Sequence, residues 1–266
     1  MTLGKGMQQY LWFHTHHKGG SHASVETYER VFRMFLAHVT SAGLRDEPAS
    51  FNRETVRTWT VAEQARGVGP RTLASRLHML GSLAQYLLTL EDGRKRPLLA
   101  EDPTRALKKP KFKKPETKFL YPAEAKNFLS AECHTCEVLP RDLFFNTMCR
   151  VSELTNANVG DLVGPDANGR YALHVLAKGG NRQIKPVSND IAEALLVTFE
   201  KREAKRTDPL LVNRHGQRWT RTGLSAAMVR LGRKAGVVRF NVSAHKIRHT
   251  AATGALAGGV NPQAVS

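Results

Sequence analysis

The sequence predicts a mainly α-helical protein with a small β-hairpin: an N-terminal helical bundle followed by a C-terminal α+β domain. Two observations predict this fold. Apolar residues recur every three or four positions before residue 105, and the period changes to two over residues 171–187. A basic, Pro-containing stretch lies between the two patterns. We therefore expect a helical domain at 1–104, a linker at 105–118 and a second domain at 119–266.

Composition restricts the class of protein. Of the 266 residues 41% are hydrophobic, enough for one or two cores, which argues against a disordered tail. Lys and Arg exceed Asp and Glu by 17, which favours binding to a polyanion, and nucleic acid is the common one. No run approaches the roughly 18 to 20 apolar residues of a membrane helix, and no signal peptide is recognisable. We expect a soluble, cytoplasmic protein that binds no membrane.

The N-terminal domain is expected to contain helices with recognisable starts. Ser24 can cap one, Asn52 can cap another, and Pro70 stands at the first position of a third. The third helix has an apolar stripe formed by Leu73, Leu77, Leu80, Ala84 and Leu87. Its polar side offers candidates for reading a DNA groove, although a solvated face explains the pattern equally well. These candidates are Arg71, Ser75 and Arg76.

The linker is the most basic segment of the chain. Residues 105–118 carry seven basic side chains against one acid, Glu116, and Pro110 and Pro115 disfavour a helix. An extended, positively charged segment can follow a phosphate backbone, although a solvated hinge without a ligand is the alternative. The candidate DNA-binding residues here are Lys108, Lys109, Lys111, Lys113 and Lys114.

The C-terminal domain mixes helices with one hairpin. A helix is expected from Pro122 to Leu129, strands at 171–176 and 183–187, and helices at about 190–205, 222–235 and after Ser243. Gly and Asn at 179–181 supply the backbone conformations that a hairpin turn requires.

Neither a disulfide framework nor a metal site is expected. Cys133, Cys136 and Cys149 are too few and too clustered for the former, and the single CxxC lacks two of the four ligands of structural zinc. Residues 209–266 contain no carboxylate, so this end of the chain cannot supply a magnesium or manganese nuclease site by itself.

The last predicted helix carries a cluster suited to phosphate chemistry. His245, Arg248 and His249 are spaced three and four apart and lie on one side of that helix. A guanidinium can grip two oxygens of a phosphodiester as charge develops on them, and Arg150 offers a second such group. Lys178, in the hairpin turn, could protonate a leaving oxygen. Each signal alone is weak, because an isolated HxxRH is usually a surface patch.

Together and in this order, the motifs resemble the tyrosine recombinase (phage integrase) family over nearly the whole chain. SHASVETYERVFRMFLAHV and GVGPRTLASRLHMLGSLAQYLL are similar to its core-binding domain, and EDPTRALKKPKFKKP to its interdomain linker. In the catalytic domain the similar segments are RDLFFNTMCRVSEL (first arginine), VLAKGGNRQIKPV (lysine hairpin) and SAHKIRHTAATGALAGGVNPQAV (the HxxR helix and the helix after it).

The resemblance implies roles for six residues. The catalytic ones are Arg150, Lys178, His245 and Arg248. The two arginines would hold the scissile phosphate, the lysine would be the general acid to the 5′ oxygen, and the histidine would assist proton transfer. Glu153 and His249 would support them. The resemblance also implies double-stranded DNA and other recombinase protomers as partners, with no metal, no nucleotide cofactor and no small-molecule substrate.

The sequence departs from the family pattern in two places. Met148 and Cys149 precede Arg150, where the family usually has a Gly. The family's nucleophilic tyrosine, which forms a 3′-phosphotyrosyl intermediate, is expected to be missing, because the five tyrosines all precede the HxxR helix. They are Tyr10, Tyr28, Tyr86, Tyr121 and Tyr171. Asn261 and Pro262 signal a helix start only a few residues before position 266, so we expect a truncated catalytic domain.

Two functions follow from these expectations. The first is site-specific DNA recombination or integration by metal-independent strand cleavage and rejoining, with this chain binding DNA but not cleaving it alone. The alternative is a non-enzymatic DNA-binding regulator or remnant that occupies recombination sites or pairs with a complete recombinase. Supercoil relaxation is a weaker third possibility, since type IB topoisomerases share the Arg, Lys and His arrangement.

Overall fold

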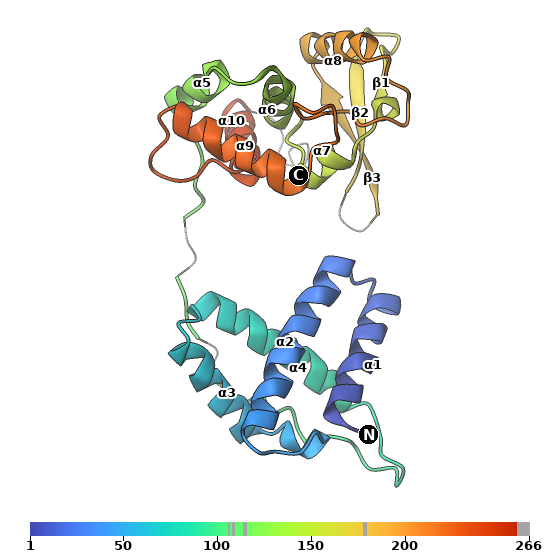
Figure 1. Ribbon diagram of the computed structural model, residues 1–266, viewed down its shortest axis with the longest axis vertical. Helices are drawn as coiled ribbons and strands as arrows, with labels where there is room; N and C mark the ends of the chain where they lie inside the picture. The colour runs from blue at the N-terminus through green and yellow to red at the C-terminus, as the bar shows by residue number, and fades with distance from the viewer. Residues whose placement is uncertain (106, 108–109, 114–115, 178–179, 260–266) are drawn as a thin grey trace. The chain divides into compact units, whose positions relative to one another are not determined.

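The computed structural model describes residues 1–105, 107, 110–113, 116–177 and 180–259. The chain forms two compact units, Met1–Pro115 and Glu116–Ser266 (Figure 1). Each unit has its own hydrophobic core. The boundary between the units falls inside the predicted linker. The helix start predicted at Asn261 and Pro262 lies outside the described residues.

The described part of the first unit is a bundle of four α-helices. They are α1 (Leu3–His16), α2 (His22–Ser41), α3 (Arg53–Ala65) and α4 (Pro70–Leu87), with a short 3₁₀ turn at Pro48–Ser50. Helix α1 was not predicted, although Leu3, Met7 and Tyr10 recur at helical spacing and all three are buried. These side chains close the bundle, because α1 packs against both α2 and α4.

Three helix starts were predicted in this unit, at Ser24, Asn52 and Pro70. Pro70 is the first residue of α4, after Gly69, as expected, and the predicted apolar stripe is buried. The prediction that Ser24 caps α2 is wrong. The cap is Ser21, whose Oγ accepts from the Ser24 main-chain N–H, so the helix begins three residues earlier than expected.

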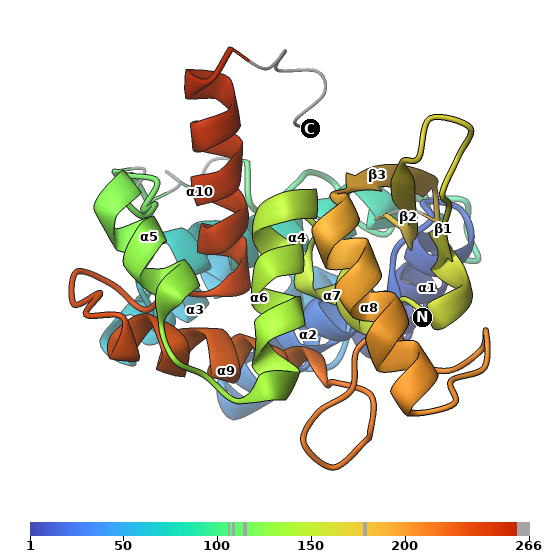
Figure 2. The ribbon, with the colours of Figure 1, turned by 90° about the horizontal axis from the view of Figure 1, so that it is seen from above.

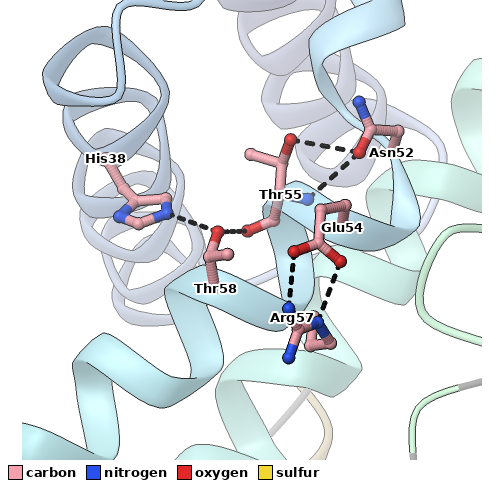
Figure 3. Close-up of polar contacts among 6 residues, drawn as sticks. All are labelled: His38, Asn52, Glu54, Thr55, Arg57 and Thr58. Atoms are coloured by element: carbon pink, nitrogen blue, oxygen red, sulfur yellow. Dashed lines mark hydrogen bonds and ion pairs between the residues drawn. The ribbon is translucent and has the colours of Figure 1, made fainter.

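The start of α3 is fixed by the predicted cap (Figure 3). Asn52 Oδ1 accepts from both the main-chain N–H and the hydroxyl of Thr55, at 3.0 and 3.1 Å. In the same first turn, the Glu54 carboxylate accepts two hydrogen bonds from the Arg57 guanidinium. The cap prediction is therefore confirmed, and the first turn of α3 has its free N–H groups partly satisfied.

A polar contact joins α2 to α3 beside this cap. His38 Nε2 lies 3.1 Å from Thr58 Oγ1, and Thr58 in turn donates to the main-chain oxygen of Thr55 (Figure 3). Burial lowers the pKa of His38, and the charge of Arg66 lowers it further. A neutral imidazole is therefore favoured at this contact.

The described part of the second unit has six α-helices and a small sheet. The helices are α5 (Pro122–Ser130), α6 (Thr135–Thr147), α7 (Val151–Asn156), α8 (Asn189–Lys201), α9 (Arg221–Lys234) and α10 (Ala244–Ala257), with a 3₁₀ turn at Val159–Asp161. Figure 2 shows α6 between α10 and α8, and it packs against both. Helix α6 is therefore the central support of the unit.

The sheet contains the predicted hairpin and one additional strand. Strands β2 (Tyr171–Leu176) and β3 (Arg182–Val187) pair antiparallel, and β1 (Leu162–Val163) pairs with the other edge of β2. Two residues are too few to show an alternating pattern, so β1 left no signal in the sequence. The predicted mainly helical fold with a small antiparallel sheet is confirmed.

No helix in the described ranges is long and apolar enough to cross a membrane.

Candidate active site

The site is built on the turn between α6 and α7. Helix α6 ends at Thr147, and Met148 takes a left-handed conformation, with φ 53° and ψ 26°. Glycine is favoured here because a Cβ is strained at positive φ. Where the family usually has a glycine, this chain therefore places a Cβ in a backbone conformation that favours a residue without one. The turn leads directly to Arg150, the residue that caps the start of α7.

Glu153 holds Arg150 in place from the first turn of α7. Its carboxylate accepts from the Arg150 main-chain N–H at 2.7 Å and from Arg150 Nη1 at 2.6 Å. The Glu153 side chain is only 1% exposed, so the charge requires close partners. The sequence implied this supporting role only through the family resemblance, and the hydrogen bonds give it a physical basis.

Arg248 reaches the same carboxylate from α10. Its Nη1 lies 4.0 Å from Glu153 Oε2 and donates to the main-chain oxygen of Met148 at 2.5 Å. The Arg248 side chain is 16% exposed and that of Arg150 is 47% exposed. Two guanidinium groups therefore meet at one buried acid, each retaining some solvent access. Such an arrangement can bind an oxyanion bidentately and stabilise charge that develops on it.

Two histidines extend the cluster along α10. His245 Nε2 and His249 Nε2 lie 2.8 Å apart, with the rings nearly perpendicular at 81°. Burial lowers the pKa of His249, and the charges of His245 and Arg248 add to this effect. A hydrogen bond between these two nitrogens requires one ring to donate and the other to accept, so a proton can be passed between the two histidines.

Lys185 is a cation near the site that was not predicted from the sequence. It lies on β3 opposite Leu173, and alternation along the strand places it on the same face as the buried Val187. Burial raises the pKa of the Cys149 thiol to about 11, while the charges of Lys185 and Arg248 act in the opposite direction. The alternating pattern could have flagged a lysine on a face expected to be apolar.

The predicted DNA-binding residues differ in their exposure to solvent. Arg71 and Ser75 are exposed on α4, and Lys111 and Lys113 are exposed beyond it. Arg76 is only 19% exposed and pairs with the fully buried Glu63 of α3. DNA contact by these residues stays a prediction. For Arg76 the pairing with Glu63 shows a role within the bundle.

Four predicted site residues lie outside the described residues. They are Lys108, Lys109, Lys114 and Lys178.

In the ranges that the structure describes, no group of three or more His, Cys, Asp or Glu side chains is arranged to hold a metal ion. Cys133, Cys136 and Cys149 are free thiols.

The C-terminal unit matches a known family. The family model described as "Phage integrase family" matches residues 118–266, more than half of the chain. The chain belongs to the phage integrase family. The resemblance drawn from the motifs is therefore confirmed.

Curated relatives are similar along most of the chain. Tyrosine recombinase XerD of Listeria innocua is 23% identical over 273 residues, which cover 97% of this chain and 87% of the relative. Tyrosine recombinase XerC of Corynebacterium efficiens is 28% identical over 251 residues, 91% of this chain and 75% of the relative. Both similarities extend through the first unit as well as the integrase domain.

Solved structures share the fold. XerH site-specific recombinase bound to difH substrate superposes with a TM-score of 0.73 at 20% identity, covering 88% of this chain and 69% of that one. Lambda integrase (residues 75–356) bound to DNA superposes with a TM-score of 0.72 at 14% identity, covering 99% and 90%. At these identities the likeness shows the fold alone. It extends beyond the integrase domain into the helical bundle.

Proposed function

We propose that this chain binds double-stranded DNA at a recombination site and holds the scissile phosphate between Arg150 and Arg248. The observation that carries the proposal is the convergence of both guanidinium groups on the buried Glu153. A single carboxylate balances only one of the two charges, so the pair keeps an excess of positive charge for a phosphodiester. The overall excess of 17 basic over acidic residues also supports a nucleic-acid partner.

The reaction supported by these residues is strand cleavage and rejoining without a metal. A tyrosine hydroxyl would attack the phosphorus and form a 3′-phosphotyrosyl bond, while the bond to the 5′ oxygen breaks. Lys178 would protonate that oxygen, and the His245–His249 pair would assist proton transfer. The two arginines would stabilise the charge on the non-bridging oxygens. Rejoining is the reverse of these steps, so one site serves both.

We infer that these 266 residues alone hold the phosphate without cleaving it. All five tyrosines precede α10. The two in the second unit, Tyr121 and Tyr171, make contacts within the fold. Tyr121 packs under the guanidinium of Arg239, 4.2 Å from its ring centre, and Tyr171 pairs with Val187 in the sheet. Lambda integrase, which shares the fold, has been solved as a dimer bound to a COC' core site and as a tetramer bound to a Holliday junction, which supports assembly with other protomers.

Duplex binding tests the phosphate site. Duplexes selected from a random library would be titrated with the wild type, Arg150→Ala, Arg248→Ala and the control Arg170→Ala. Arg170 is an exposed arginine of the same unit, paired with Asp166. We expect each site variant to lose about tenfold or more in affinity, because a charge-assisted phosphate contact is lost, and the control to stay within about twofold. Equal affinity for all four proteins would refute the phosphate site.

Cleavage is tested separately on a denaturing gel. A nicked duplex carrying the selected site traps any covalent intermediate as a protein–DNA band. We expect no such band from the 266-residue chain. A band that survives denaturation would contradict the inference that this chain holds the phosphate without cleaving it.

The position of the tyrosines also favours a second function, that of a regulator that occupies recombination sites. Such a protein should inhibit a reaction run by a complete recombinase on the same duplex, or enter mixed complexes with it. Recombination that continues unchanged at saturating amounts of this chain would count against a regulatory role.

A further inference from the structure

The far end of α7 is held by a guanidinium from a distant part of the chain. Arg218 Nη1 donates to the main-chain oxygens of Thr155 and Ala157 at 2.9 and 3.0 Å. Its Nη2 donates to Asn158 Oδ1 at 2.6 Å. Arg218 follows these acceptors by about 60 positions in sequence, so it joins α7 to a separate segment of the unit.

Helix α7 needs such an anchor because it is short. It spans six residues, Val151–Asn156. The last four carbonyl groups of any helix lack partners within it, so in a helix of this length few internal hydrogen bonds remain. A cation at the C-terminal end also interacts favourably with the helix dipole. Arg218 supplies both the donors and the charge.

Arg218 is itself held firmly. It forms a β-bridge with Val212, and the intervening turn is closed by hydrogen bonds between Asn213 and Gln217. Two residues later Thr220 caps the start of α9 through a hydrogen bond from the Gly223 N–H. Helix α9 contributes to the core of the unit through Leu224, Met228 and Leu231. The position of the Arg218 guanidinium is therefore set by the body of the domain.

The two ends of α7 thus have different partners. At its start, Arg150 and Glu153 face Arg248 of α10, and at its end Arg218 links it to the segment before α9. Only a few residues separate the two ends of α7, so a shift at its end is passed to its start. Catalytic groups require placement within about 0.5 Å.

We propose that Arg218 is a positioning residue, which sets the placement of Arg150 and Glu153 against Arg248 by anchoring α7. This role rests on the proposed function, because its effect is on the phosphate site. Arg218 acts through the helix and contacts no DNA.

The first test compares Arg218→Gln with a matched control. Arg202 also donates from a half-buried guanidinium to two main-chain oxygens, those of Pro209 and Leu210, which are not part of α7. We expect both Gln variants to lose stability in urea. Only Arg218→Gln should lose duplex affinity, by about tenfold, because only it releases α7. An equal loss of affinity in Arg202→Gln would overturn the proposal.

A double-mutant cycle separates positioning from direct contact. If Arg218 acts through Arg150, then Arg218→Gln should change the affinity by less than about twofold in a protein that already carries Arg150→Ala. Independent, multiplying losses would mean that Arg218 touches DNA or acts elsewhere, and would overturn the proposal. If Arg218→Gln does not fold, Arg218→Lys enters the same cycle, because its ammonium retains some of the hydrogen bonds.

Hydrogen exchange keeps this test distinct from the test of the proposed function. In Arg218→Gln without DNA, the amides of α7 should exchange at least about tenfold faster, and those of α10 should be unchanged. Unchanged exchange in α7 would refute the anchor whatever Arg150→Ala does to binding. Faster exchange in α7 together with an Arg150→Ala variant that binds normally would refute the phosphate site instead, and with it the positioning role.

Discussion

Arg248 Nη1 donates a hydrogen bond to the main-chain oxygen of Met148, 2.5 Å away and 100 positions earlier in the sequence. Met148 is held in a left-handed conformation at the end of α6, and Arg150 follows two residues later. One turn therefore both presents Arg150 and fixes Arg248. The distance between the two guanidinium groups depends on the backbone conformation of a residue that is not glycine.

The strain at Met148 can be measured by comparing two substitutions. Met148→Ala removes the side chain but keeps the Cβ, and Met148→Gly also removes the Cβ. We expect Met148→Gly to be more stable than Met148→Ala by about 1 kcal/mol, because a positive φ is costly only with a Cβ. Urea unfolding checks this. If Met148→Ala is the more stable of the two, the turn is not strained by its Cβ.

Glu153 should be sensitive to loss of its charge. Glu153→Gln leaves two guanidinium groups facing a neutral amide in a buried site, so we expect the free energy of unfolding to fall by about 2 kcal/mol or more. The matched control is Glu54→Gln, which removes an exposed acid paired with Arg57. Chemical denaturation measures the free energy of unfolding of both variants. An equal loss of stability in the two variants would show that Glu153 does not hold the arginines.

Stability should decrease as the pH falls from 7.5 to 5.5. The pKa values of His14, His38 and His249 are all lowered from the ordinary value of 6.5, with burial as the largest cause. Below about pH 7 the unfolded chain therefore binds more protons than the folded one, and this destabilises the fold until the folded histidines are also protonated. The midpoint of urea unfolding should therefore fall as the pH is lowered across this range. In a variant with His14, His38 and His249 all changed to Gln, the midpoint should depend much less on pH.

This pH window excludes the carboxylates. The pKa of Glu124 is lowered from 4.5, chiefly by its hydrogen bond from Arg239, so its stabilisation is complete above 4.5 and is lost only at lower pH. A midpoint that stays constant down to pH 5 and falls only below it would attribute the acid sensitivity to carboxylates instead of histidines.

The basic linker should contribute affinity without sequence preference. Changing Lys111, Lys113 and Lys114 together to Ala should weaken binding to all duplexes alike. Each lost phosphate contact should reduce the slope of log affinity against log salt by about 0.9. Arg71→Ala, by contrast, should change the preference among duplexes. Titrations at several salt concentrations test both, and an unchanged slope in the triple variant would refute the linker contact.

The three thiols should differ in reactivity. Cys149 is fully buried with its pKa raised to about 11, whereas Cys133 and Cys136 are half-buried. Since the thiolate is the reactive form, a thiol reagent at pH 8 should modify two cysteines in the folded protein and the third only after unfolding. Mass spectrometry of the modified peptides identifies them. Early labelling of Cys149 would show that the turn before Arg150 opens readily.

Much of the local structure could be predicted from the sequence because it depends on neighbouring residues. Asn52 and Pro70 mark helix starts through bonds within one turn, and the hairpin at 171–187 follows from alternation around a Gly-containing turn. The candidate site residues came from motifs of a few positions whose order resembles one family. Helices α1 and α6 and strand β1 were missed. The apolar spacing of α1 was overlooked, α6 contains Pro140, which disfavours a helix, and the two residues of β1 carry no pattern.

By itself the sequence determined the fold class, the family, the positive charge and the types of residue in the proposed phosphate site. Only the tertiary structure decided how those residues meet. It placed Glu153 between Arg150 and Arg248, buried Arg76 against Glu63, and brought Arg218 to the end of α7. Apart from the Arg150–Glu153 pair, these contacts join residues from 13 to 95 positions apart. No spacing rule in a single sequence specifies such pairs, because they form only when separate elements pack on a shared core.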